Sequence, residues 1–196
     1  MAAFDPIGMS GALLVRLEIH RDSRGDFART WSAEDFRAAG IDFAPVQSNA
    51  STTNEHGTIR GMHFQRAPRE EAKLVRCARG RIWDVITDLR PDSPTFRQSF
   101  GLELAADADV ALFVPTGVAH GFQTMTDDVR VEYLMSAPYA PELADGFRYD
   151  DTAAAIAWPL PARRVSDRDL AWPPLATRGL WTGTDRFATR RREKVG

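Results

Sequence analysis

Between residues 46 and 135 the chain alternates short apolar-rich runs with turn residues, and this spacing limits the possible folds more than any other feature of the sequence. Gly80, Pro91, Pro94 and Pro115 separate several of the runs. Many short strands at such close spacing predict a β-sandwich or closed barrel and argue against a parallel α/β sheet. The predicted strands cover residues 46–53, 58–65, 73–78, 81–88, 98–104, 110–114, 119–125 and 129–135.

The first forty residues predict two strands and one helix. Residues 13–19 alternate, with leucine, valine and isoleucine side chains on one face of a strand. Residues 22–25 predict a turn, and residues 27–31 a second strand. Residues 32–40 predict a short helix, because a serine can cap its start, acidic residues suit its first turn and a glycine can end it.

After residue 150 the pattern changes. Residues 150–157 predict a weak helix or a turn, and the prolines that follow predict an extended segment that wraps over the body. Without an internal repeat or a low-complexity linker, we expect a single domain over residues 1–196 that ends in a tail over 176–196. The basic residues of this tail predict a solvated terminus rather than a phosphate-binding or membrane segment: Arg186, Arg190, Arg191 and Arg192.

Composition excludes several classes of protein. The net charge is -2 and the pI about 6.1, whereas a nucleic-acid-binding domain is usually basic. Cys77 is the only cysteine, so no disulfide forms within the chain, and its apolar surroundings predict a core residue rather than a catalytic thiol. The N-terminus lacks a signal-peptide pattern, and no apolar run approaches a membrane span. We therefore expect a cytoplasmic protein with no nucleic-acid or membrane partner.

Side chains suited to proton transfer are spread over the predicted strands. His63 and Gln65 share one face of a strand because side chains alternate. Taken alone, an inward histidine is more often a hydrogen-bonded core group, and Lys73, Tyr133 or Asp169 would more often be structural. Together these residues supply a base, a cation, an acid and a carboxylate for reversible proton transfer.

The histidine spacing argues against a metal site. Metal-binding cupins usually offer His-x-His, then a glutamate and a later histidine, but residues 63–65 read His-Phe-Gln. Lys73 stands near the expected glutamate, and its cation would repel a divalent ion. Glu70 and Glu71 could supply a carboxylate, but their Pro-Arg-Glu-Glu stretch predicts an exposed loop. We expect no metal and no other cofactor.

Longer strings, in order and at plausible spacing from about residue 13 to 175, point to one known family. They include Ile-Arg-Gly-Met-His-Phe-Gln at 59–65 and Pro-Thr-Gly-Val-Ala-His-Gly-Phe at 115–122. On these strings the chain resembles the dTDP-4-dehydrorhamnose 3,5-epimerase family. The remaining strings that carry the resemblance are residues 22–27, 47–49, 73–75, 80–85, 88–96, 156–159 and 166–169.

The resemblance implies a mainly β, cupin-type jelly-roll barrel with a short N-terminal helix and an extended or helical C-terminal segment. It implies a homodimer that exchanges N-terminal strands. The implied substrate is a 4-keto-6-deoxy sugar on a nucleoside diphosphate, inverted at C3, C5 or both. A ketone at C4 acidifies both carbons, so a cationic donor at the enolate oxygen would contribute roughly 10²–10³ in rate and each positioned proton-transfer group roughly 10²–10⁴.

The resemblance also implies roles for single residues. His63 resembles the catalytic base, Asp169 its orienting carboxylate and Tyr133 the general acid. Lys73 resembles the cation near the enolate. The implied substrate-binding residues, some of them acting from the partner subunit, are Arg24, Phe27, Gln47, Asn49, Arg60, His120 and Arg168.

Two positions depart from the family pattern. Leu134 follows the tyrosine where many relatives have lysine, and Arg29 replaces a common acidic residue near the nucleotide, so a CDP or GDP sugar stays open. Three other functions also stay open: a nucleotide-sugar ketoisomerase, a non-catalytic nucleotide-sugar-binding cupin and a metal-dependent cupin oxygenase or isomerase. The pairing of Tyr133 with Asp169 argues against the ketoisomerase. The complete proton-transfer set argues against a non-catalytic binding protein, and Gln65 argues against a metal-dependent cupin.

Overall fold

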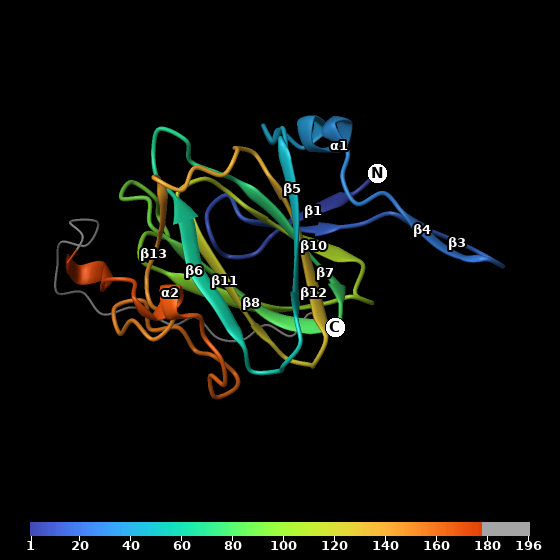
Figure 1. Ribbon diagram of the computed structural model, residues 1–196. Coiled ribbons are helices and arrows are strands. Elements are labelled where there is room, and N and C mark those ends of the chain that lie inside the picture. The colour runs from blue at the N-terminus through green and yellow to red at the C-terminus, as the bar shows by residue number, and fades with distance from the viewer. Residues whose placement is uncertain (178–196) are drawn as a thin grey trace.

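The computed structural model describes residues 1–177, and its main feature is a pair of facing antiparallel sheets (Figure 1). One sheet has six strands, in the order β1 (Ala3–Pro6), β2 (Leu13–Arg16), β10 (Val110–Val114), β7 (Lys73–Arg79), β12 (Val129–Met135) and β5 (Gln47–Thr53). The other has five, in the order β13 (Ala144–Gly146), β6 (Ile59–Gln65), β11 (Val118–Thr124), β8 (Arg81–Asp88) and β9 (Ser99–Ala105). The predicted mainly β jelly roll is confirmed.

The main core fills the space between the sheets. Val75 and Leu112 enter it from the six-stranded sheet, and Ile82, Leu104 and Phe122 from the five-stranded sheet. Cys77 belongs to the same cluster and is buried, as predicted. Burial raises the pKa of its thiol to about 11, which leaves it protonated and unreactive at neutral pH.

Two further apolar clusters cover the outer faces of the sandwich. Since side chains alternate along a strand, Val15 and Phe113 point away from the main core and pack with Phe36 of α1 (Ala33–Ala38). Leu134 packs against the same cluster, so this departure from the family pattern lies on the face opposite to Tyr133. The C-terminal segment covers the other sheet, where Phe147 is fully buried; this bears out the predicted wrapping.

The predicted elements agree with the structure in the middle of the chain and less well at its ends. All eight strands predicted over residues 46–135 form, with ends that differ by at most one residue. Ser32 caps α1 as predicted, because its side chain accepts a hydrogen bond from the backbone N–H of Asp35. Residues 152–155 form turns, one of the two structures predicted for residues 150–157. The structure also contains β1 and β13, which were not predicted because they are short and depend on distant partners. The short helix α2 (Asp167–Leu170) lies in the C-terminal segment that the resemblance gave as extended or helical.

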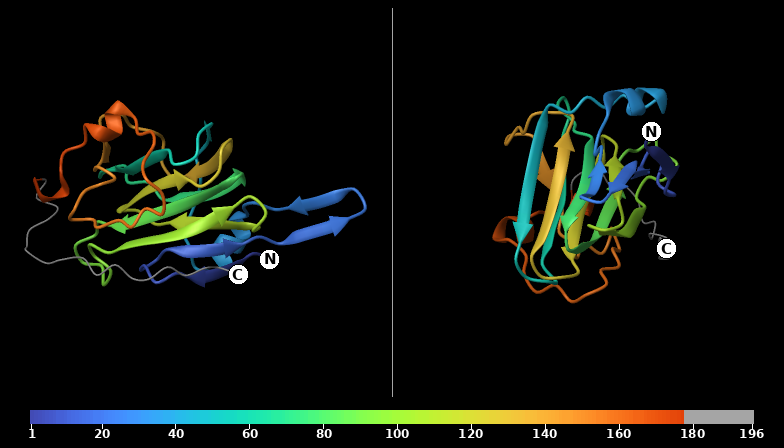
Figure 2. Two further views of the ribbon diagram at one scale, coloured as in Figure 1. Left: turned by 90° about the horizontal axis from the view of Figure 1, so that it is seen from below. Right: turned by 90° about the vertical axis from the view of Figure 1, so that its right-hand side faces the viewer.

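The prediction of one strand over residues 13–19 and another over 27–31 is wrong. β2 ends at Arg16, and the chain then forms a separate hairpin of β3 (Ile19–Asp22) and β4 (Gly25–Ala28). This hairpin projects well beyond the two sheets (Figure 2). Because it pairs with itself instead of joining β2, its alternating side chains reach solvent, and Phe27 is 66% exposed.

Helices contribute little to the described part of the chain. Besides α1 and α2 it contains one 3-10 turn, η1 (Leu175–Thr177). The longest of these helices has six residues, which is too short to cross a bilayer. The arginines predicted to form a solvated tail lie outside the described residues.

Candidate active site

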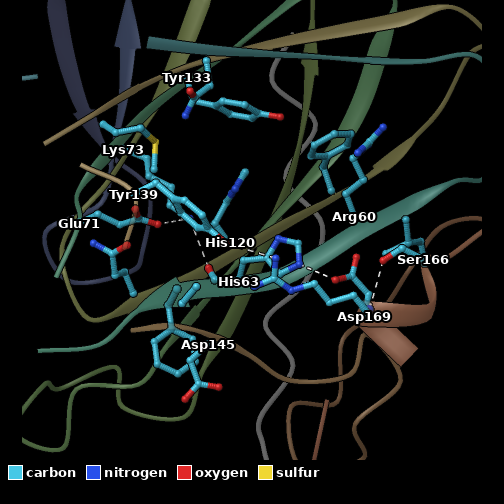
Figure 3. A pocket seen from close by; sticks show the side chains of 18 of the residues that line it. Arg60, His63, Glu71, Lys73, His120, Tyr133, Tyr139, Asp145, Ser166 and Asp169 are labelled. Carbon is cyan, nitrogen blue, oxygen red and sulfur yellow. Dashed lines mark hydrogen bonds and ion pairs between the residues drawn. The ribbon is translucent and has the colours of Figure 1, made fainter. Parts of the chain in front are cut away.

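A pocket of about 940 Å³ opens between the two sheets. Strands β5, β7 and β12 line it from one side, and β6, β11 and β13 from the other. The segment that leads into α2 closes a third side (Figure 3). The pocket therefore collects side chains that are far apart in the sequence.

The base and carboxylate expected from the sequence meet in this pocket. Nε2 of His63 lies 2.6 Å from a carboxylate oxygen of Asp169, and the other oxygen accepts the backbone N–H of Gly61 at 3.3 Å. Ser166 caps α2 and thereby sets the direction of this carboxylate. Burial acts to raise the pKa of Asp169, but the hydrogen bond and charge of His63 and the Gly61 N–H outweigh it, so the pKa is lowered. An ionised carboxylate at Nε2 keeps the proton there and leaves Nδ1 of His63 as the basic nitrogen.

Gly61 and Gly121 fix the position of His63 relative to His120. His63 on β6 is paired in register with His120 on β11, and the register shifts just beyond them. A Cβ atom on Gly61 would lie 2.6 Å from the Cα of Gly121, and Gly61 has a φ of 134°. Only glycine fits such a close approach of two strands. The pair of glycines therefore lets both imidazoles enter the same pocket.

His120 rests on a buried carboxylate that the sequence analysis did not single out. Its Nε2 lies 2.9 and 3.0 Å from the two oxygens of Asp84, which is fully buried. Burial raises the pKa of Asp84, although the charges of His120 and Lys73 act against this. An acid inside the apolar strand of residues 81–88 was the sequence signal for such a pair. Nδ1 of His120 remains available to a ligand.

Lys73 is almost completely buried at the wall of the pocket. Its ammonium donates to the carbonyl oxygen of His63 at 3.3 Å and lies 3.1 Å from a carboxylate oxygen of Glu71. The prediction of an exposed loop is wrong for Glu71, whose side chain is only 10% exposed. At this position the chain has already turned inward to begin β7. An ammonium has three hydrogens, so one remains for a ligand in the pocket.

Tyr133 reaches the pocket from β12, in the sheet opposite to that of His63. Its hydroxyl donates a 2.5 Å hydrogen bond to Oγ of Ser51, a residue that the sequence analysis missed. Burial raises the pKa of Tyr133, while Ser51 and the charge of Arg60 act in the opposite direction. Because the pKa stays above its ordinary value near 10, the phenol carries its proton at neutral pH and can act as an acid.

Polar and cationic residues border the same pocket. Arg60 donates to Oγ1 of Thr53 and to the carbonyl oxygen of Thr52, which holds its guanidinium along β5. Gln47 and Asn49 are hydrogen-bonded to each other at 2.9 Å, and both line the pocket. Arg168 lines it as well, 3.4 Å from the hydroxyl of Tyr139 and stacked over the Trp172 ring. Such guanidinium groups suit a diphosphate.

The structure does not bring two of the predicted substrate-binding residues to this pocket. Arg24 and Phe27 lie on the projecting hairpin, where the Arg24 side chain is 87% exposed and paired with Asp22. Arg29 follows the same hairpin and is also exposed. Within one chain the pocket therefore lacks these three side chains among its lining residues.

Gln65, at the place of a cupin metal ligand, is engaged with the backbone. Its amide nitrogen donates to the carbonyl oxygens of Arg69 and Pro138, and its oxygen accepts the N–H of Ala140. These bonds hold the loops that contain Arg69 and residues 138–140 against Gln65 at the edge of the pocket. In residues 1–177 no group of three or more His, Cys, Asp or Glu side chains has a geometry that could hold a metal ion.

Comparisons with known proteins point to one family. A sequence model of the dTDP-4-dehydrorhamnose 3,5-epimerase family matches residues 6–177. The chain is 38% identical over 173 residues to the dTDP-4-dehydrorhamnose 3,5-epimerase of Sinorhizobium fredii, and the match covers 88% of this chain and 89% of that relative.

Solved structures of epimerases are also similar. The dTDP-4-dehydrorhamnose 3,5-epimerase of Bacillus anthracis, with TDP and PPi bound, superposes with a TM-score of 0.86 at 36% identity, covering 89% of this chain and 100% of that one. A 3′-monoepimerase from Streptomyces bikiniensis, in complex with dTDP-quinovose, gives 0.81 at 35% identity and covers 88% and 87%. These matches confirm the cupin-like form of the jelly roll. The chain thus belongs to the dTDP-4-dehydrorhamnose 3,5-epimerase family, a family of isomerases.

Proposed function

We propose that this isomerase inverts C3, C5 or both in a nucleoside-diphosphate 4-keto-6-deoxy sugar by removing a proton from one face and returning one to the other. One observation carries the proposal. His63 and Tyr133 enter a single pocket from opposite sheets, and Lys73, whose ammonium donates to the carbonyl oxygen of His63, lines the same pocket. Inversion needs this arrangement, because a single base returns a proton only to the face from which it took it.

His63 is the proposed base. Its Nδ1 removes the hydrogen next to the ketone, and the ionised carboxylate of Asp169 stabilises the imidazolium that forms. Asp169 also holds the imidazole in one tautomer and one orientation.

Lys73 stabilises the enolate. Its remaining N–H donates to the C4 oxygen, on which the negative charge develops. Since the ammonium is buried, little water screens this interaction. His120, held by Asp84, contributes its free Nδ1 to the sugar.

Tyr133 is the proposed acid. Its phenol gives a proton to the carbon from the face opposite to His63. Arg60, Gln47, Asn49 and Arg168 bind the nucleotide and its diphosphate.

The projecting hairpin supports a homodimer as part of this function. An exposed phenylalanine on a hairpin that leaves its own sheets is suited to contact with a second copy. Arg24 and Phe27 then bind the nucleotide in the partner's pocket. We expect His63→Ala to be inactive and Phe27→Ala to turn over slowly at low substrate concentration. Mixing the two kinds of subunit should raise the activity above that of either variant, because one of the two pockets becomes complete. Failure to raise the activity in proven mixed dimers would remove the hairpin from the site.

The substrate is tested directly in D₂O. The protein is incubated with dTDP, CDP and GDP forms of a 4-keto-6-deoxy sugar, and NMR follows C3 and C5. We expect deuterium at an inverted carbon with the dTDP sugar, the nucleotide bound in the related structures. The same spectra decide between a 3,5-epimerase and a 3-monoepimerase, since the latter labels C3 alone. The proposed function would be overturned if none of the three sugars showed exchange.

We also propose that the enzyme acts in the cytoplasm, in keeping with its single cysteine.

A further inference from the structure

The hydroxyl of Tyr133 has a defined partner on the neighbouring strand. β5 and β12 are antiparallel, with Tyr133 opposite Asn49 and Val131 opposite Ser51. Ser51 is therefore the diagonal neighbour of Tyr133 on the face that turns toward the pocket. The phenol extends along this diagonal, and its hydroxyl donates to Oγ of Ser51 at 2.5 Å.

The same stretch of β5 also holds the guanidinium whose positive charge lowers the pKa of the phenol. Arg60 donates to Oγ1 of Thr53 and to the carbonyl oxygen of Thr52. Three consecutive residues thus fix both the hydroxyl of Tyr133 and the guanidinium of Arg60. Burial opposes ionisation of the phenol, and Ser51 and Arg60 are the two groups that favour it.

We propose that Ser51 is a positioning residue for Tyr133, an inference that rests on the proposed role of Tyr133 as the acid. Before reaction, Ser51 accepts the phenolic hydrogen bond and holds the ring in its orientation. When Tyr133 gives its proton to the enolate carbon, the O–H bond breaks, a C–H bond forms and a phenolate remains. A hydroxyl can donate as well as accept, so Ser51 then turns its own O–H toward the phenolate oxygen.

Water restores the protonation states of His63 and Tyr133 after each turnover. After one turnover His63 carries one additional proton and Tyr133 lacks one. The imidazolium releases its proton to water, and the phenolate takes one from water. Ser51 keeps its own proton throughout, so it acts on the orientation and stability of Tyr133 and not on the stoichiometry.

Three variants test the role of Ser51. Ser51→Ala removes the hydroxyl, and Ser51→Thr keeps it on a side chain that suits a strand. Ser48→Ala is the matched control, because Ser48 lies on the same strand but on its exposed face, outside the pocket. Each is incubated in D₂O with the substrate that the wild type converts, and exchange, inversion and dTDP affinity are measured.

In Ser51→Ala, inversion should slow roughly three- to tenfold, the value of one hydrogen bond, while exchange through His63 and dTDP affinity stay near the wild type. Ser51→Thr should recover most of the inversion rate, and Ser48→Ala should match the wild type. Normal inversion in Ser51→Ala, or equal loss in Ser51→Ala and Ser51→Thr, would overturn the proposal. Equal loss of exchange and inversion would also overturn it, since Ser51 would then serve enolate formation. A wild type without exchange would instead refute the proposed function.

Discussion

Asp169 holds His63 through a 2.6 Å hydrogen bond although 106 positions separate the two residues in the sequence. The carboxylate is placed by a helix of four residues whose cap, Ser166, binds the backbone N–H of Asp169. The base of the proposed reaction is therefore built from two parts of the chain. β6 supplies the imidazole, and the C-terminal segment supplies the group that orients it.

Loss of His63 should stop the chemistry without preventing binding. His63→Ala is expected to show neither deuterium exchange nor inversion, and dTDP affinity by calorimetry should change little. Asp169→Asn should slow exchange by roughly 10²-fold, because the amide favours the wrong tautomer and does not stabilise the imidazolium. His56→Ala is the control, since His56 pairs with Asp127 at an exposed position. Exchange at the wild-type rate in His63→Ala would exclude this histidine as the base.

Tyr133→Phe should separate exchange from inversion. The variant loses only a hydroxyl, so the ring still packs, and His63 still moves protons on its own face. The ratio of exchange to inversion, read by NMR in D₂O, is expected to rise well above that of the wild type. Tyr149→Phe, outside the pocket, should leave the ratio unchanged. If exchange and inversion fall together in Tyr133→Phe, the tyrosine is needed to form the enolate and the two-face assignment is wrong.

Arg60→Lys should weaken nucleotide binding although the charge is kept. A guanidinium can bind phosphate oxygens through two parallel hydrogen bonds, which an ammonium cannot reproduce. A loss of roughly tenfold in dTDP affinity is expected by calorimetry. Arg79→Lys is the control, because Arg79 pairs with Asp128 away from the pocket. Equal affinity of Arg60→Lys and the wild type would rule out a direct phosphate contact.

Removal of metal should leave turnover unchanged. The amide of Gln65 is already bonded to three backbone groups, and the Lys73 ammonium lies in the same pocket. Extensive dialysis against a chelator, followed by metal analysis and a rate measurement, checks this. Loss of activity that stoichiometric zinc, iron or manganese restores would contradict it.

Asp88 should make the free energy of unfolding depend on pH in the acid range. It is fully buried and accepts hydrogen bonds from Arg90, Ser93 and Thr95. Burial would raise the pKa of Asp88, but these bonds outweigh it and the pKa is lowered. Its contribution is therefore complete above the unfolded pKa of about 3.9 and is lost as the pH falls through the lower folded value.

Asp88→Asn should accordingly lower the free energy of unfolding at pH 7 by about 2–4 kcal/mol. The variant's stability should also decline less steeply than the wild type's below about pH 4. Thermal unfolding followed by circular dichroism between pH 7 and 3 measures both effects. Asp92→Asn, a neighbouring exposed aspartate, serves as the control. Parallel pH curves for Asp88→Asn and the wild type would show that Asp88 does not carry this dependence.

The sequence predicted the strands of the sandwich well because their alternation and turn residues are local signals. It also indicated most of the pocket residues, since the resembling strings carry them. Ser51 could not be found in this way, because it lies in a polar run and its contact with Tyr133 follows from the register of β5 against β12. Glu71 was assigned to a loop because an acidic pair after a proline is typical of one. Strands β1 and β13 depend on pairing with β2 and β6, which no local pattern encodes.

In the proposed reaction, the placement of His63 and Tyr133 on different sheets ties the spacing of the sandwich to the width of the sugar ring. Val75 and Ile82, buried between the sheets, help to set that spacing and thereby the distance between His63 and Tyr133. A larger or smaller side chain at either position would shift the reach of both proton-transfer groups together while leaving each intact. In the proposed reaction, the stability of the interior and the fidelity of inversion therefore depend on the same apolar side chains.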